Sequence, residues 1–244
     1  MNLCTDQLAM ILAGEDQLVS ISHLSLDPLM SPMTEAAARY PVNFGRAEEV
    51  YLASPDLVLA EPYAARAGVE ALRGLGVQVE IFEPVSTLDQ IPDRIRQMGE
   101  VLGREDEADR LVSAFHARRS ALSAPDGPRP VAALYYANGY TLGPETLAGQ
   151  LIAEAGFDNL AERLGLNWGG QMPLESLVLA EPDVVIVADR YPGASRSESI
   201  LDHPALAELR ARAAGMTTGP EWVCGTPATL DALEALVALR KSLQ

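Results

Sequence analysis

The chain is poor in the residues that mark several common classes of protein. It has two cysteines, Cys4 and Cys224, among 244 residues, and only 5% of its residues are aromatic. One cysteine pair is too few for a disulfide-stapled scaffold, and it does not report a redox compartment. Because no sequence pattern fixes the distance between the two sulfur atoms, we expect two small buried side chains in preference to a disulfide.

Positive charge is scarce as well. The chain carries 18 Lys and Arg against 34 Asp and Glu, which gives a formal net charge of -16. Phosphate contacts need cations, so we expect no nucleic-acid partner. An acidic surface favours docking onto a basic partner surface instead.

Long apolar runs and catalytic motifs are missing. No run approaches the ~20 residues that a membrane-spanning helix needs. The opening MNLCTDQLAMIL is typical of a strand that leads into a helix, and it lacks the basic stretch and apolar core of a signal peptide. The sequence has no G-x-G-x-x-G after a strand, no P-loop, no G-x-S-x-G and no H-E-x-x-H. We therefore expect a protein that is not an enzyme.

The chain does contain one phrase twice. Residues 48–60 and 175–187 are identical at six of thirteen aligned positions, and "NFG" (43–45) and "NWG" (167–169) precede the two copies. In each copy a short helix must end before a proline, Pro55 or Pro182, and an apolar strand follows directly. The repeat predicts two related lobes.

The remaining segments predict the fold class. Strand-like segments at 17–22, 77–82 and 131–136 alternate with helix-prone segments, which indicates parallel sheets. Residues 87–123 are helix-prone with an interruption near Gly103, so this connector is stiff, unlike a Gly/Ser-rich hinge. We predict an α/β fold of two Rossmann-like lobes with parallel sheets, joined by a long rigid α-helix, with a ligand cleft between the lobes. The predicted boundaries are 1–86 for the first lobe, 87–124 for the helical linker and 125–244 for the second lobe.

Several segments together resemble a known family. NLCTDQL, IRQMGEVLGREDEADRL, ETLAGQLIAEAGFDN and the paired E…LA.PD segments resemble the periplasmic substrate-binding proteins of ABC importers for iron-siderophore complexes and cobalamin. The resemblance covers essentially the whole chain. It implies a periplasmic, monomeric capture protein that binds a siderophore, haem or corrinoid chelate and docks onto an ABC permease in the inner membrane. It also implies no cofactor, since the metal is carried only within the bound chelate. Family members have a secretion signal and a strand before the segment matching NLCTDQL, so we expect the natural start to lie upstream of Met1.

Candidate ligand-binding residues lie where the predicted strands end. Ligands of open α/β sheets gather beyond the carboxyl ends of the strands, and most of the few aromatic residues fall in these loops. Aromatic walls suit a large flat chelate, and arginines pair with carboxylate or phenolate oxygens. The alternative is that the aromatic residues pack loops onto the sheets and the arginines are solvated. The candidates are Asp6, His23, Tyr63, Arg66, Tyr136, Asn138, Tyr140, Trp168, Arg190, Tyr191 and Trp222.

Three scattered histidines do not form a metal site, so we expect no metal ion held directly by the protein.

Glu48 and Glu175 open the two copies of the repeat, where a carboxylate stabilises a helix N-terminus. The resemblance implies a second role for them, docking onto arginines of the permease.

Two rival functions stay open. A cytosolic two-lobed α/β enzyme of the nucleotide-sugar transferase type would need a diphosphate-binding glycine loop, for which GYTLGPETL is the nearest match. A chelate scavenger or sensor would act without a permease.

Overall fold

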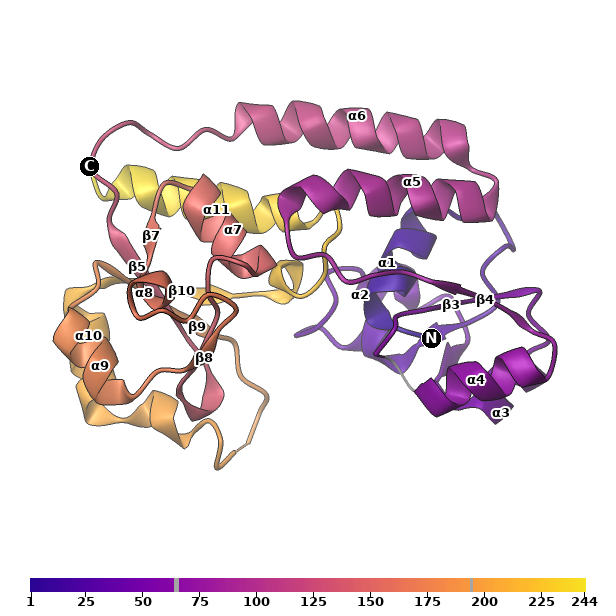
Figure 1. Ribbon diagram of the computed structural model, residues 1–244, viewed down its shortest axis with the longest axis horizontal. Helices are drawn as coiled ribbons and strands as arrows, with labels where there is room; N and C mark the ends of the chain where they lie inside the picture. Colours follow the sequence, from indigo (N-terminus) through magenta and orange to yellow (C-terminus); the bar gives the residue numbers. More distant parts are fainter. Residues whose placement is uncertain (64–65, 194) are drawn as a thin grey trace. The chain divides into compact units, whose positions relative to one another are not determined.

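The computed structural model describes residues 1–63, 66–193 and 195–244. The chain divides into two compact units, the first comprising residues 1–85, 89–118 and 223–228, and the second comprising 86–88, 119–222 and 229–244. Figure 1 shows the elements of both units in sequence colours. Within the described part of the chain, no helix is both long and apolar enough to cross a bilayer.

The first unit contains short strands in two separate parallel pairs. β1 (Ile21–Ser22) pairs with β2 (Val42–Asn43), and β3 (Leu57–Ala60) pairs with β4 (Gln78–Ile81). Its helical elements are α1 (Leu3–Leu12), η1 (His23–Leu26), α2 (Thr34–Ala37), α3 (Ala47–Leu52), α4 (Arg66–Gly74) and α5 (Ile91–Leu102), with η2 (Leu88–Gln90) preceding α5. Among the described residues, the single sheet that we expected in this unit is therefore split into two two-stranded sheets. A cavity of about 280 Å³ is lined by β3, by residues 17–20 and by Asn43.

The helical connector consists of two helices. α5 ends at Gly103, whose φ of 64° is the left-handed conformation that glycine adopts readily, and α6 (Glu105–Ala121) follows. A Cβ atom on Gly99 would collide with the Cβ of Ala108, so the helices pack closely at this point (Figure 1). The prediction of one long helix is therefore wrong in detail. The interruption near Gly103 is a chain reversal, and residues 89–118 belong to the first unit by their contacts.

The second unit has the continuous parallel sheet that the sequence predicts. Its strand order is β10 (Ala214–Thr218), β9 (Val184–Ala188), β5 (Val131–Tyr135) and β7 (Asp158–Asn159), all parallel. A short antiparallel ribbon of β6 (Tyr140–Thr141) and β8 (Gly170–Gln171) stands apart from it. The remaining elements are η3 (Ala137–Gly139), α7 (Leu147–Glu154), α8 (Leu160–Arg163), α9 (Leu174–Ala180), η4 (Ser199–Asp202), α10 (Pro204–Arg212), η5 (Pro220–Trp222) and α11 (Thr229–Ser242).

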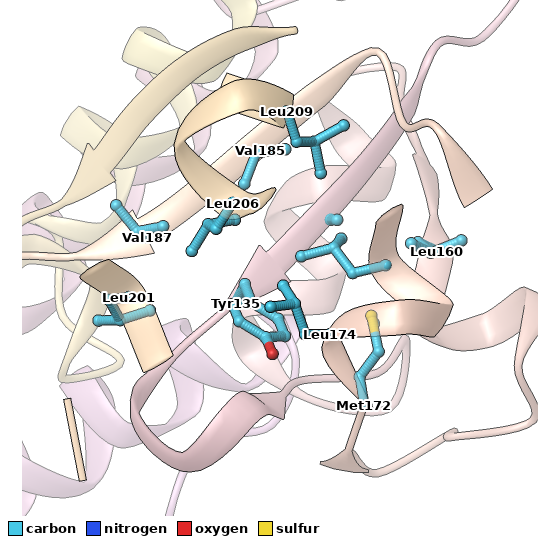
Figure 2. Packing of buried hydrophobic residues seen from close by; sticks show 11 residues of the cluster. Tyr135, Leu160, Met172, Leu174, Val185, Val187, Leu201, Leu206 and Leu209 are labelled. Atoms are coloured by element: carbon cyan, nitrogen blue, oxygen red, sulfur yellow. The ribbon is translucent and has the colours of Figure 1, made fainter. Parts of the chain in front are cut away.

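The core of the second unit lies against β5 and β9. Both strands are apolar along their length because each is covered on both faces. Figure 2 shows Tyr135 of β5 beside Leu174 of α9, with Leu206 of α10 next to Val187 of β9. The helices that follow β8 and β9 therefore cover one face of this sheet.

The two cysteines form a disulfide, contrary to our expectation. The S–S distance between Cys4 and Cys224 is 2.08 Å and their Cα atoms lie 5.3 Å apart. Residues 223–228 belong to the first unit although the rest of the C-terminal segment belongs to the second. The return of this short segment brings together two residues separated by 220 positions, which no local pattern could indicate.

The repeated phrase folds in the same way twice. α3 and β3 form the first copy, and α9 and β9 form the second. Ser54 and Glu181, each directly before the proline of its copy, have φ values of 50° and 43°. Both short helices are thus followed, directly before the proline, by a residue with a left-handed φ, which is uncommon outside glycine.

Candidate functional site

In the first unit, an aromatic pair lies at the carboxyl end of β1 and β2. The strands are parallel with Ser22 opposite Asn43, so the next residues, His23 and Phe44, emerge at the same edge. Their rings are stacked, with centroids 4.7 Å apart and planes 28° from parallel. Both side chains are exposed, Phe44 to 60%. A flat aromatic surface is therefore open to solvent where a ligand is expected.

The first turn of α1 joins the ends of two strands. Asp6 accepts hydrogen bonds from the backbone N–H of Ser22 at 2.6 Å and from the Ser25 hydroxyl at 3.1 Å. The side chain of Glu61, which directly follows β3, is hydrogen-bonded to Asn2, the N-cap residue of α1. The carboxyl ends of β1 and β3 thus meet at one place.

Asp6 differs from its predicted role. It is buried, and one carboxylate oxygen accepts both hydrogen bonds while the other lies 3.8 Å from the ammonium group of Met1. Burial raises the pKa of the Asp6 carboxyl, against the opposing influence of the Met1 ammonium and the Ser22 N–H. This carboxylate holds the loop after β1 in place and is not open to a ligand.

Tyr63 and Arg66 are both exposed, Tyr63 three residues after β3 and Arg66 at the start of α4. Arg66 forms no ion pair with any residue in the described ranges. Its guanidinium group is therefore available to an anionic ligand.

In the second unit, β5 runs into a tight turn. The backbone N–H of Tyr136 donates to the carbonyl of Tyr140 at 2.8 Å. Asn138 has a φ of 57°, and its N–H donates to the carbonyl of Ser197 at 2.6 Å. These bonds tie the turn to the loop before η4 and leave the Asn138 side chain exposed.

The hydroxyl of Tyr136 already has a hydrogen-bond partner within the second unit. It is hydrogen-bonded to the side chain of Thr218, the last residue of β10. Burial raises the pKa of this phenol well above its ordinary value of 10.0. Tyr136 thus stays neutral and links the ends of β5 and β10 across β9, and it is not set to act as a phenolate ligand for a metal.

Tyr140 lies in the antiparallel ribbon, and Trp168 lies next to it. Tyr140 begins β6, Trp168 lies two residues before β8, and Trp168 is 63% exposed. An indole ring this exposed contributes little to the core, so it is free to cover a ligand.

The glycine loop GYTLGPETL is explained by packing. A Cβ atom on Gly143 would collide with the carbonyl oxygens of Leu166 and Asn167, and one on Gly149 would collide with the carbonyl of Gly143. The N–H of Glu145 donates to the Asn167 carbonyl at 3.0 Å. These glycines allow backbone to pack on backbone, so the loop does not support the rival reading as a diphosphate site.

The last three predicted residues differ in accessibility. Arg190 makes a bidentate ion pair with Asp202, in which its two terminal guanidinium nitrogens lie 3.0 and 2.8 Å from the carboxylate oxygens. This pair raises the pKa of Arg190 and lowers that of Asp202. An anionic ligand must therefore compete with Asp202 for this guanidinium group. Tyr191 is exposed, whereas Trp222 is only 9% exposed and its indole N–H has no partner among the described residues. Burial makes Trp222 a poor candidate for an open aromatic wall.

Glu48 and Glu175 lie in the first turns of α3 and α9, and both are exposed. The contact at the start of α3 is made by Glu49, which accepts from the N–H of Phe44 at 2.9 Å. Glu48 and Glu175 themselves form no hydrogen bond or ion pair within the described residues. The described part of the chain also contains no group of three or more His, Cys, Asp or Glu side chains that could hold a metal ion.

Sequence reasoning missed Phe44 and Thr218. The signal for Phe44 was present, because its NFG segment corresponds to the NWG segment that contains Trp168. The two aromatic side chains are exposed to nearly the same extent, 60% and 63%. Thr218 gives no comparable signal, because it meets Tyr136 only through the order of strands in the sheet.

Comparison with known proteins identifies the family. Residues 1–216 match the family described as "Periplasmic binding protein". The chain belongs to this family. The members are binding proteins and not enzymes, in agreement with the sequence analysis.

Curated relatives of this periplasmic binding protein are named as cobalamin-binding proteins. A cobalamin-binding protein of Halobacterium salinarum is 28% identical over 188 residues, which is 73% of this chain and 51% of that protein. The chain therefore spans about half the length of the curated relatives that it matches.

Solved structures share the fold. The apo form of the periplasmic heme-binding protein RhuT from Roseiflexus sp. RS-1 has a TM-score of 0.82 at 22% identity, covering 99% of this chain and 96% of that chain. The ABC-type Fe3+-hydroxamate transport system of Saccharomonospora viridis DSM 43017 has a TM-score of 0.68 at 21% identity, covering 99% and 91%. These similarities confirm the predicted two-lobed α/β fold.

Proposed function

We propose that this periplasmic binding protein captures a metal chelate and delivers it to an ABC permease in the inner membrane. The ligand is a ferric siderophore, haem or corrinoid, and no bond is made or broken. Membership of the family supports a binding role, and relatives named for cobalamin, heme and Fe3+-hydroxamate support the class of ligand.

One observation carries the proposal. Each unit presents an exposed aromatic ring just outside a strand, Phe44 stacked on His23 in the first and Trp168 in the second. Covering a large apolar side chain is worth about 1.5–3 kcal/mol. A large flat chelate covers such rings efficiently, whereas a small polar solute does not.

Arg66 supplies the charge that an anionic chelate needs. Its guanidinium group has no ion-pair partner among the described residues, in contrast to Arg190, which Asp202 holds. We assign anion binding to Arg66 first and to Arg190 second, because the Arg190–Asp202 pair must open before Arg190 can bind a ligand.

The Cys4–Cys224 disulfide supports a location outside the reducing cytosol. Disulfides persist in oxidising compartments such as the bacterial periplasm and are rare in the cytosol. We therefore propose that the chain works in the periplasm.

Docking onto the permease is assigned to Glu48 and Glu175. Each is exposed, lies at the start of one copy of the repeat, and has no hydrogen-bond or ion-pair partner among the described residues. A carboxylate without an internal partner is available for an arginine of another protein.

Calorimetric titration with a panel of chelates tests the proposal. The panel contains haem, cyanocobalamin, a ferric hydroxamate and a ferric catecholate. We expect one of the four to bind, and we expect Phe44→Ala and Trp168→Ala each to weaken that binding about tenfold, because each removes a ring that the ligand covers. Tyr51→Ala is the matched control, since Tyr51 is exposed on α3 but does not follow a strand.

Two outcomes would refute the assignment. One is the absence of binding by all four chelates. The other is binding that neither substitution weakens, or that Tyr51→Ala weakens equally, because the rings would then not contact the ligand.

A further inference from the structure

Two leucines stand out among the exposed apolar residues. Leu52 is 81% exposed and Leu179 is 83% exposed. They occupy the same position in the two copies of the repeat, 127 residues apart, and this position is one of the six at which the copies are identical. A single exposed leucine needs no explanation, but two at equivalent positions in related units indicate a common use.

Each leucine shares a helix face with an exposed glutamate. Glu48 precedes Leu52 by four residues in α3, and Glu175 precedes Leu179 by four in α9. Residues four apart are neighbours on a helix surface. Each unit therefore presents a carboxylate beside an apolar side chain, and we call this arrangement the Glu–Leu pair.

The fold itself makes no use of the Glu–Leu pairs. The leucines bury little of their side chains, and neither glutamate has a hydrogen-bond or ion-pair partner among the described residues. The same helices bury other apolar residues, Val50 in α3 and Leu177 in α9. The pairs thus lie on the faces turned away from the cores.

We propose that Leu52 and Leu179 are apolar anchors for the permease, each entering a hydrophobic pocket beside the cation that binds the neighbouring glutamate. This inference rests on the proposed docking role of Glu48 and Glu175 and adds a second kind of contact to it. The occupant is a cationic protein surface with two like sites, because the chain is acidic, with a net charge of -16, and offers the same Glu–Leu pair once per unit.

The two kinds of contact differ in their response to salt. A glutamate–cation contact at the rim of an interface weakens as ionic strength rises, whereas burial of a leucine does not. The charge contact speeds association, and the leucine contact slows dissociation. The inference therefore predicts separable effects.

The test measures binding of the full chain to the ABC permease of its own organism, purified with its ATPase subunits in nanodiscs. We expect Leu52→Ser together with Leu179→Ser to weaken binding by about a hundredfold, tenfold for each leucine, mainly through faster dissociation. Glu48→Arg together with Glu175→Arg should slow association in a salt-dependent manner. Leu75→Ser together with Leu164→Ser is the matched control, because these exposed leucines lie outside the repeat.

The outcomes separate this inference from the proposed function. Loss of binding in the glutamate variant with unchanged binding in the leucine variant would overturn the inference alone. Failure of the unaltered chain to bind the permease would overturn the docking role and the inference together. A leucine variant that changes the sedimentation of the chain itself would show that the leucines join two copies, which also overturns the inference. Chelate affinity and thermal stability should be unchanged in the leucine variant, which shows that it is folded.

Discussion

Removal of the Cys4–Cys224 disulfide should destabilise the first unit. The bond joins the second residue of α1 to the segment 223–228, which packs with the first unit. The residues between the two cysteines form a loop of 220 positions, and most of the second unit lies inside this loop. Without the bond, the unfolded chain gains conformational freedom that the folded chain does not.

The magnitude follows from the length of the loop. The chain-entropy relation gives about 5 kcal/mol for a loop of this size, the upper end of measured disulfide contributions. If the second unit stays folded while the first unfolds, the freely moving part of the loop is shorter and the loss is about 3–4 kcal/mol. With a urea dependence of about 2 kcal/mol per molar, either value lowers the unfolding midpoint by about 1.5–2.5 M.

The assay is urea unfolding of the oxidised protein, the reduced protein and the Cys4→Ser, Cys224→Ser double variant. Hydrogen exchange of α1 reports the first unit, while tryptophan fluorescence reports the second, because Trp168 and Trp222 both belong to it. We expect faster exchange in α1 and a lower midpoint in both the reduced protein and the variant. Equal midpoints in all three proteins, or two free thiols in the native protein, would refute this reasoning.

Three further predictions concern local features. Ser54→Gly should raise stability by about 0.5–1 kcal/mol in thermal melts, because the left-handed conformation of Ser54 strains every residue except glycine; a lower melting temperature would contradict this. Gly143→Ala should lower stability by several kcal/mol or prevent folding, because the new methyl group meets two carbonyl oxygens, and a circular-dichroism melt like that of the unaltered chain would disprove the packing account. The hydrogen bond from Arg163 is the main cause that lowers the pKa of Asp158, so this carboxylate stabilises the fold above its ordinary value of 3.8 and that contribution is lost as pH falls through the lowered pKa. Asp158→Asn should therefore be less stable than the unaltered chain at neutral pH but converge with it in acid, and a constant difference in unfolding midpoint from pH 7 to pH 2 would show that the carboxylate charge is not involved.

Much of the fold follows from residues that act over short distances. The buried runs of β5 and β9 and the prolines that end α3 and α9 predict the sheet of the second unit and the repeat of the lobes. Contacts between distant residues were not predictable. The disulfide depends on where residues 223–228 return, and the chain reversal at Gly103 depends on the packing of Gly99 against Ala108.

The candidate site was predicted in part for the same reason. Strand ends indicate where ligand-facing residues should lie, and two of the residues predicted on this basis, His23 and Trp168, are exposed. Sequence position does not reveal whether a polar or aromatic group is already engaged. Asp6 is enclosed by its hydrogen bonds and Trp222 is buried, and neither fact is visible before the chain is folded.

The left-handed residues Ser54 and Glu181 have a consequence for the two exposed leucines. Leu52 and Leu179 each lie two positions before the residue at which the backbone reverses, so the helix cannot extend and bury them under another turn. Their orientation is determined by main-chain geometry that is the same in both copies. A mutation that relaxes either reversal should thus shift the leucine without altering it, and it should weaken the proposed permease contact without replacing a residue of that contact.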